Sequence, residues 1–314
     1  MSRPTAEQIE RLFAGQRARH TRAEVAAAAG VSGELAARLW RALGFATLPD
    51  DTVAFTDADV DALGVVRTLL DGGLLDAESA IRMARALGQT TARLAQWQAE
   101  IVIGAMLPGD GPPSDEELTR VMEAAGRLLP DLEQLLVHVW RAQLGAAGSR
   151  LLALADLTDE AAPTRATLAV GFADLVSFTS RARELDEREL AELVEGFESR
   201  AADVIAGHGA RLVKTLGDEV LFTAPTAQVA AAVALDLVRP ELRIGLAYGP
   251  VVPMMGDVFG TTVNLASRLT GLARPGTVLI DQALARHVAP ERTRRLRRRT
   301  VAGLGPVQPY LLRS

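Results

Sequence analysis

The sequence lacks several residue types on which whole classes of function depend. None of its 314 residues is a cysteine, which excludes disulfide bonds, thiolate metal sites and a cysteine nucleophile. No apolar run reaches the ~18 residues that a membrane-spanning helix requires, and no secretory signal pattern opens the chain. We therefore expect a soluble, cytoplasmic protein that does not enter a membrane.

Aromatic residues are also scarce, and acidic residues slightly outnumber basic ones. Aromatics make up 4% of the chain, and the net charge is −5. A negative balance argues against bulk attraction to nucleic acid. Hydrophobic residues nevertheless reach 48%, enough for substantial cores, and the length suggests about two domains.

Lysine is almost missing. Lys214 is the only one, and the other 33 basic residues are arginine. An ammonium is a compact point donor, whereas a guanidinium is a wide planar fork, so this lysine is a candidate for chemistry that arginine cannot do. Asp218 follows at an abrupt Gly-Asp turn between two apolar runs, which predicts a tight hairpin. The alternative is an exposed lysine beside a solvated turn.

The first half of the chain reads as successive helices. Pairs with capping-box spacing occur at Thr21/Glu24 and Ser114/Glu117, and Thr56 marks a further helix start. We predict an all-α domain over residues 1–155, followed by a linker over 156–164. Residues 21–45 have the outline of a helix-turn-helix, but residues 32–39 offer only Arg38 as a strong reader of base or phosphate. Helical packing is therefore favoured there over DNA binding.

The second half, residues 165–314, alternates strands and helices. Strands are expected over 165–174, 211–216, 220–223 and 242–248, with helices over 186–206 and 227–238. This β-α-β-β-α-β order is the split βαβ arrangement of ferredoxin-like folds. A further hairpin arm, a helix over 262–272 and a strand over 277–280 follow. The fold class is α+β.

Two acids stand at strand ends, Asp174 and Asp218. Hard divalent cations such as Mg²⁺ prefer carboxylate oxygens and retain water and substrate phosphates as further ligands. Two such ions can activate an attacking oxygen and hold a leaving phosphate. Two acids alone are an unspecific signal.

A third group lies further along the chain. Asn264 and Arg268 are four residues apart and so share one helix face. An amide and a guanidinium on one face suit a sugar and a charged phosphoryl group. A polar stripe facing solvent is the alternative for this pair in isolation.

These segments together resemble the catalytic domain of class III adenylyl cyclases, over residues 166–312. The resemblance rests on three blocks: Phe172-Ala-Asp-Leu-Val-Ser-Phe-Thr, Lys214-Thr-Leu-Gly-Asp-Glu-Val and Asp257-Val-Phe-Gly-Thr-Thr-Val-Asn-Leu-Ala-Ser-Arg. A helical half before one cyclase domain is similar to mycobacterial soluble cyclases whose N-terminal half restrains the catalytic half.

The resemblance implies a role for each position. Asp174 and Asp218 would hold two Mg²⁺ or Mn²⁺ ions, with the backbone carbonyl of Leu175 assisting. Lys214 would donate to adenine N1, and Asp257 would accept from the N6 amino group. Guanine presents the reverse pattern of donor and acceptor.

In this family Asn264 would orient the ribose, and Arg268 would stabilise charge on the α-phosphate. The 3′ hydroxyl of ATP would attack that phosphate, giving cyclic AMP and pyrophosphate. Family sites lie between two catalytic domains, so the resemblance implies a head-to-tail homodimer. One chain would supply the two metal aspartates, and the other would supply the remaining four side chains.

The sequence departs from the family at its C-terminal end. Many members carry a lysine against the triphosphate, but the comparable stretch here is Val301-Ala-Gly-Leu-Gly305. An upstream arginine is a candidate substitute, from the set Arg292, Arg294, Arg295, Arg297, Arg298 and Arg299. The missing lysine leaves a second hypothesis open, a nucleotide-binding regulator with little turnover. The helical half and the short linker also predict autoinhibition by residues 1–155.

Overall fold

The computed structural model describes residues 3–107, 111–155, 166–176, 178, 182–301 and 303–313. It divides into two compact units, Met1–Ser149 and Arg150–Ser314. The predicted linker over 156–164 lies outside the described residues, as do Arg165, Ser177 and Thr179. Among the helices that can be described, none combines the length and the apolar character needed to cross a membrane.

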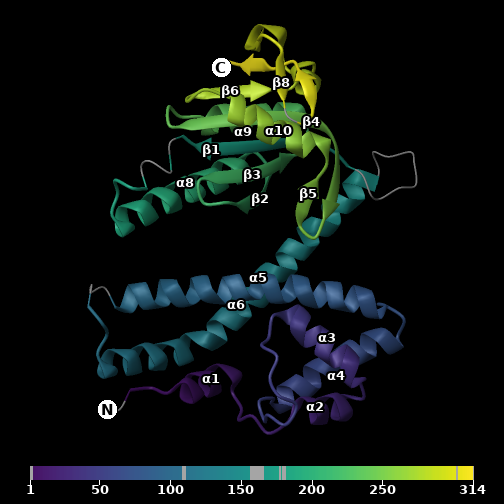
Figure 1. The fold of residues 1–314 in the computed structure, drawn as a ribbon, viewed down its shortest axis with the longest axis vertical. Coiled ribbons are helices and arrows are strands. Elements are labelled where there is room, and N and C mark those ends of the chain that lie inside the picture. The colour runs from purple at the N-terminus through teal and green to yellow at the C-terminus, as the bar shows by residue number, and fades with distance from the viewer. Residues whose placement is uncertain are drawn as a thin grey trace. The chain divides into compact units, whose positions relative to one another are not determined.

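The first unit is helical, as predicted (Figure 1). The capping boxes at Thr21 and Thr56 form, and the side chains of Ser114 and Glu117 bond reciprocally to each other's backbone N–H groups. Each cap satisfies amides that the first helical turn leaves unpaired. The helices are α1 (Ala6–Ala14), α2 (Arg22–Ala29), α3 (Gly33–Leu43), α4 (Asp57–Asp71), α5 (Ala77–Met106) and α6 (Asp115–Ala155).

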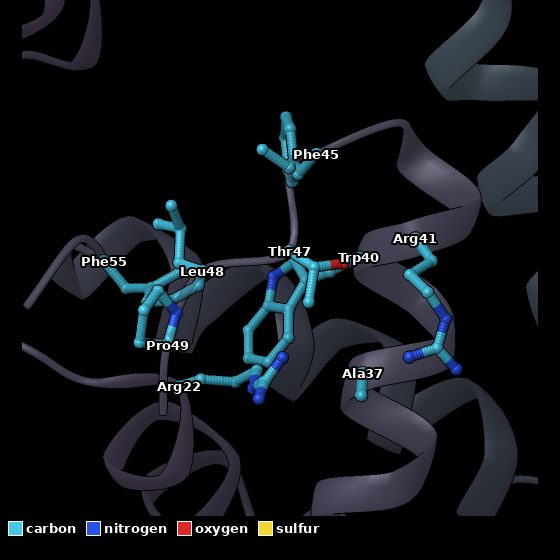
Figure 2. Close-up of a pocket in the computed structure, with 10 residues that line it drawn as sticks. Arg22, Ala37, Trp40, Arg41, Phe45, Thr47, Leu48, Pro49 and Phe55 are labelled. Atoms are coloured by element: carbon cyan, nitrogen blue, oxygen red, sulfur yellow. The ribbon is translucent and has the colours of Figure 1, made fainter. Parts of the chain in front are cut away.

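A small core holds α2 to α5 together, built around Val25, Leu39, Trp40 and Ile81. Trp40 stacks at an angle against Phe55, with ring centroids 4.7 Å apart. Figure 2 shows this aromatic pair within a pocket. The cavity there is only about 20 Å³, room for roughly one water, so this pocket is a packing feature.

The second unit is built on one mixed sheet (Figure 1). Its strands lie in the order β2 (Arg211–Thr215), β3 (Glu219–Ala224), β1 (Ala166–Leu175), β4 (Leu242–Met254), β6 (Thr277–Ile280), β10 (Tyr310–Leu312) and β7 (Thr293–Arg295). Its first four strands are antiparallel neighbours, and β6 runs parallel to β4. The order β2-β3-β1-β4 is that of a ferredoxin-like fold, which confirms the predicted fold class.

Most elements predicted for this unit lie within one or two residues of their predicted bounds, but β4 continues to Met254 where a strand over 242–248 was predicted. The strands outside the main order are β5 (Asp257–Phe259), β8 (Arg299–Val301) and β9 (Gly305–Val307). The helices are α8 (Glu187–Gly207), α9 (Ala227–Leu237), α10 (Thr261–Leu272), α11 (Gln282–Ala285) and the 3-10 turn η1 (Pro290–Arg292).

Alternation along the strands separates two cores. Ala169 and Ala173 of β1 join α8 and α9 in the larger core, whereas Val170 and Phe172 join α10 in a second one. Because side chains alternate along a strand, Asp174 belongs to the same face as Phe172. The sheet thus presents its first candidate acid on the face that carries α10.

Candidate functional site

The end of β1 and the tip of the β2–β3 hairpin meet, which brings the two predicted metal acids to one place. The Leu175 amide donates to the Asp218 carbonyl oxygen at 2.8 Å. Gly217 adopts φ +76°, a left-handed conformation that glycine tolerates well, and so allows the tight turn before Asp218. Asp174 and Asp218 therefore stand at the same end of the sheet.

Asp174 is 7% exposed, and its surroundings act in both directions on the pKa of its carboxyl group. Burial raises the pKa of its carboxyl group and the Asp218 charge adds to this, while a hydrogen bond and ion pair with Arg243 oppose it. Arg243 faces Asp174 directly across the β1–β4 ladder. The guanidinium supplies the countercharge that a buried carboxylate needs.

Glu219 is a third acid in this cluster, and the sequence reasoning missed it. It lies opposite Asp174 across the β1–β3 ladder. Burial, followed by the charges of Asp174 and Asp218, raises the pKa of Glu219 to about 7. Protonation of this carboxyl relieves repulsion among three neighbouring acids.

The donor set fits a divalent cation that keeps other ligands. Among the described residues, no group of three or more His, Cys, Asp or Glu side chains is placed to hold a metal by itself. Mg²⁺ is usually held by one or two carboxylates together with water and substrate phosphates. Two aspartates at one sheet end match that requirement without forming a closed protein cage.

Lys214 and Asp257 lie together although 43 residues separate them. The Lys214 ammonium donates to Asp257 Oδ2 at 2.5 Å, and their side chains are 38% and 24% exposed. A second contact from β2 reinforces this placement, because Arg211 donates to the Gly256 carbonyl oxygen at 2.6 Å. Two cations on β2 thus hold the β4–β5 hairpin in position.

That hairpin closes through a two-residue turn. Met254 pairs with Asp257, and Met255 and Gly256 between them have φ +52° and +79°. Positive φ at both central residues is the type I′ pattern that suits a twisted hairpin. The turn fixes the position at which Asp257 meets Lys214.

Asn264 and Arg268 lie on the exposed side of α10, while Ala266 and Leu269 face the sheet. Neither polar side chain forms a hydrogen bond or ion pair with another described residue. Both are consequently available to a ligand or a partner chain. The structure thus brings the six side chains into three groups: the acid pair, the Lys214–Asp257 pair and the α10 pair.

The C-terminal arginines that were candidates for the triphosphate are all exposed. They lie on or beside η1, β7 and β8, and the set is Arg292, Arg294, Arg295, Arg297, Arg298 and Arg299. No geometric feature selects one of them.

Comparison with known proteins identifies the two halves separately. Residues 3–147 match the family described as "Adenylate cyclase regulatory domain". Residues 161–314 match the family described as "Adenylate and Guanylate cyclase catalytic domain". The chain is therefore a class III cyclase with an N-terminal regulatory domain.

Two relatives match this chain across both of its halves. An adenylate cyclase of Streptomyces coelicolor is 49% identical over 293 residues, covering 90% of this chain and 75% of the relative. One of Glutamicibacter nicotianae is 38% identical, covering 99% of this chain and 82% of the relative. The solved adenylyl cyclase CyaB of P. aeruginosa is 23% identical with a TM-score of 0.43, covering 48% of this chain and 95% of that one. The chain belongs to the adenylate cyclase family.

Proposed function

We propose that this enzyme converts ATP to 3′,5′-cyclic AMP and pyrophosphate. The observation that carries the proposal is the Lys214–Asp257 pair, because it offers one donor and one acceptor side by side. The edge of adenine presents one acceptor, N1, and one donor, the N6 amino group. Lys214 donates to N1 and Asp257 accepts from the amino group.

Two other groups complete the proposed mechanism. Asn264 orients the ribose so that its 3′ hydroxyl points at the α-phosphate. Arg268 stabilises the negative charge that develops there, with a guanidinium that pairs with no carboxylate among the described residues. Catalysis rests mainly on positioning and charge stabilisation, as is usual for phosphoryl transfer.

Asp174 and Asp218, with the Leu175 carbonyl, are the residues that would hold two Mg²⁺ or Mn²⁺ ions. An ion held by these residues would supply positive charge against the phosphates and beside the attacking hydroxyl. Arg243 keeps the buried Asp174 carboxyl paired before any cation binds.

We further propose that the active form is a head-to-tail homodimer in which the acid pair of one chain faces the other four side chains of its partner. The β4–β5 hairpin supports this, because it exposes several large apolar side chains. They are Val252 at 38%, Met254 at 52%, Met255 at 57% and Phe259 at 44%. Clusters of exposed apolar residues mark interaction surfaces.

Regulation is proposed to reside in the first domain, with bounds at 1–155, a linker at 156–164 and the catalytic domain at 165–314. Removing residues 1–155 should raise the turnover of the remaining fragment, because the helical domain restrains it. An unchanged or lower rate in a fragment verified to be dimeric refutes the restraint. Side-by-side rate profiles of the chain and fragment against pH identify whether protons are the signal.

The activity is tested with purified full-length protein, ATP and either Mn²⁺ or Mg²⁺. Cyclic AMP should form, Asp174→Ala should abolish it, and Arg268→Ala should lower kcat by about 10²- to 10³-fold. Asp203→Ala, which removes an exposed aspartate of α8, is the matched control and should retain full activity. Tight ATP binding by the wild type without product in either metal would instead identify a nucleotide-binding regulator.

A further inference from the structure

Four arginines from two helices converge on one cavity in the first unit. Arg38 and Arg41 come from α3, and Arg82 and Arg85 come from α5. The cavity has a volume of about 230 Å³ and is also lined by Glu78. It lies apart in sequence from every residue placed in the proposed catalytic machinery.

The helices pack closely enough to make this a fixed cradle. A side chain on Gly88 of α5 would come within 2.2 Å of the Leu43 carbonyl oxygen at the end of α3. Ala42 and Ile81, which are 8% and 5% exposed, form the apolar floor between the helices. The four guanidinium groups therefore project from backbones that cannot easily separate.

The positive charge in this cradle is poorly compensated. Glu78 is the one acid lining it, and it is already paired with Arg38. Arg82 donates to Ser79 Oγ at 2.8 Å. Arg41 and Arg85 are exposed and make no side-chain hydrogen bond or ion pair with any residue that the structure describes.

The spacing of these arginines makes the imbalance worse. Arg38 and Arg41 are three residues apart on one helix, as are Arg82 and Arg85 on the other. Like charges at this spacing face each other and destabilise a helix. An anion between the helices would relieve repulsion within both pairs and between them.

We propose that this cradle binds a compact phosphate-type anion with at least two negative charges. A guanidinium fork matches two phosphate oxygens at once. The volume lies below the ~300–1,000 Å³ typical of sites for drug-sized ligands, so it favours one to a few phosphate groups over a whole cofactor. Duplex DNA is disfavoured, because α3 packs against α5 and one arginine of α3 is held by Glu78.

The test is a titration of the full-length protein with inorganic phosphate, pyrophosphate and chloride. It is done by calorimetry at constant ionic strength, because salt screens such contacts. EDTA is present throughout, so that the proposed metal-dependent site does not contribute. Saturable binding of phosphate or pyrophosphate, but not chloride, is expected, with a matching rise in Tm.

The decisive comparison is between two double variants with the same loss of charge. Arg41→Gln with Arg85→Gln should weaken binding at least tenfold, since it removes both unpaired guanidinium groups. Arg120→Gln with Arg127→Gln, on exposed positions of α6, should leave binding unchanged. Arg85→Gln alone gives a smaller loss and serves if the double variant proves unstable.

Binding of phosphate alone, lost in the same variant, also supports the proposal. Absence of saturable binding, or an equal loss in both double variants, overturns it. The measurement involves neither metal nor turnover, so its failure would leave the cyclase proposal untouched, and failure of the cyclase assay would leave this one untouched.

Discussion

Adding one methyl group at Gly245 should disable the enzyme without touching any residue of the proposed site. Gly245 lies in the middle of β4, opposite Phe172 of β1. A Cβ atom there would meet the backbone nitrogen of Thr270 at 2.2 Å and the Ala266 carbonyl oxygen at 2.5 Å. Both atoms belong to the backbone of α10, which cannot rotate away as a side chain can.

The size of the disturbance follows from those distances. An ordinary contact begins near 3.4 Å, so α10 must move by about 1.2 Å from the sheet to admit the methyl group. Arg268 lies on the turn between these two contacts and would move with the helix. A misplacement of about 1 Å can cost about 10²-fold in rate, and overpacking of this kind costs about 1–3 kcal/mol of stability.

The assay compares Gly245→Ala with Gly271→Ala, a control substitution within α10. Gly271 has open space where its Cβ would lie, and alanine is the better helix former by up to about 1 kcal/mol. We expect Gly245→Ala to lower kcat by about 10²-fold at saturating ATP, with an earlier unfolding midpoint, and Gly271→Ala to do neither. A Gly245→Ala protein with at least half the wild-type kcat and an unshifted midpoint refutes the reasoning.

Two further predictions concern charged side chains. Lys214→Met should lower kcat/KM for ATP by about 10- to 100-fold, since a hydrogen bond to a charged group is worth about 1.5–3 kcal/mol. Steady-state kinetics measure this ratio, and an unchanged kcat/KM removes Lys214 from base recognition. The second concerns Asp281. Burial raises the pKa of its carboxyl group above the ordinary value of 3.8, although backbone hydrogen bonds from Leu284 and Tyr248 act to lower it. Because the folded state favours the protonated acid, the free energy of unfolding should fall as pH rises from about 3.8 to the raised pKa. Asp281→Asn retains the acceptor that caps α11. It should flatten the decline of the unfolding free energy with pH, measured by urea unfolding from pH 3.5 to 8. The same decline in both proteins contradicts the assignment.

Local pattern was sufficient for most of the fold. The predicted helix over 186–206 forms as Glu187–Gly207 with Asp186 as its cap, and the predicted strand over 277–280 forms as Thr277–Ile280. Apolar periodicity, capping residues and turn glycines encode such elements within a few neighbouring positions. The strand order followed because a βαββαβ sequence of elements has few compact solutions.

The partners of the site residues could not be read in the same way. Arg243 meets Asp174 across 69 residues, and Arg211 holds the turn at Gly256 across 45. These contacts depend on which strand lies beside which and in what register, which no local pattern specifies. Glu219 was adjacent to a predicted acid, yet its proximity to Asp174 appears only once β3 is paired with β1. The arginine cradle was missed likewise, since its arginines on α3 and α5 lie 44 residues apart in the sequence.

The exposure of the Lys214–Asp257 pair bears on how the enzyme would distinguish bases. A partly exposed ion pair contributes about 0–1 kcal/mol, so realigning it for adenine costs little. Guanine would set a donor against the ammonium and an acceptor against the carboxylate, leaving each group without its hydrogen bond once the base excludes water. Each such mismatch costs about 1–3 kcal/mol, and a site built to hydrogen-bond its substrate rejects mismatches for this reason. Under the proposed base recognition, discrimination against GTP would come from the penalty on the wrong base, and the weak pair in the free protein is compatible with strong selectivity.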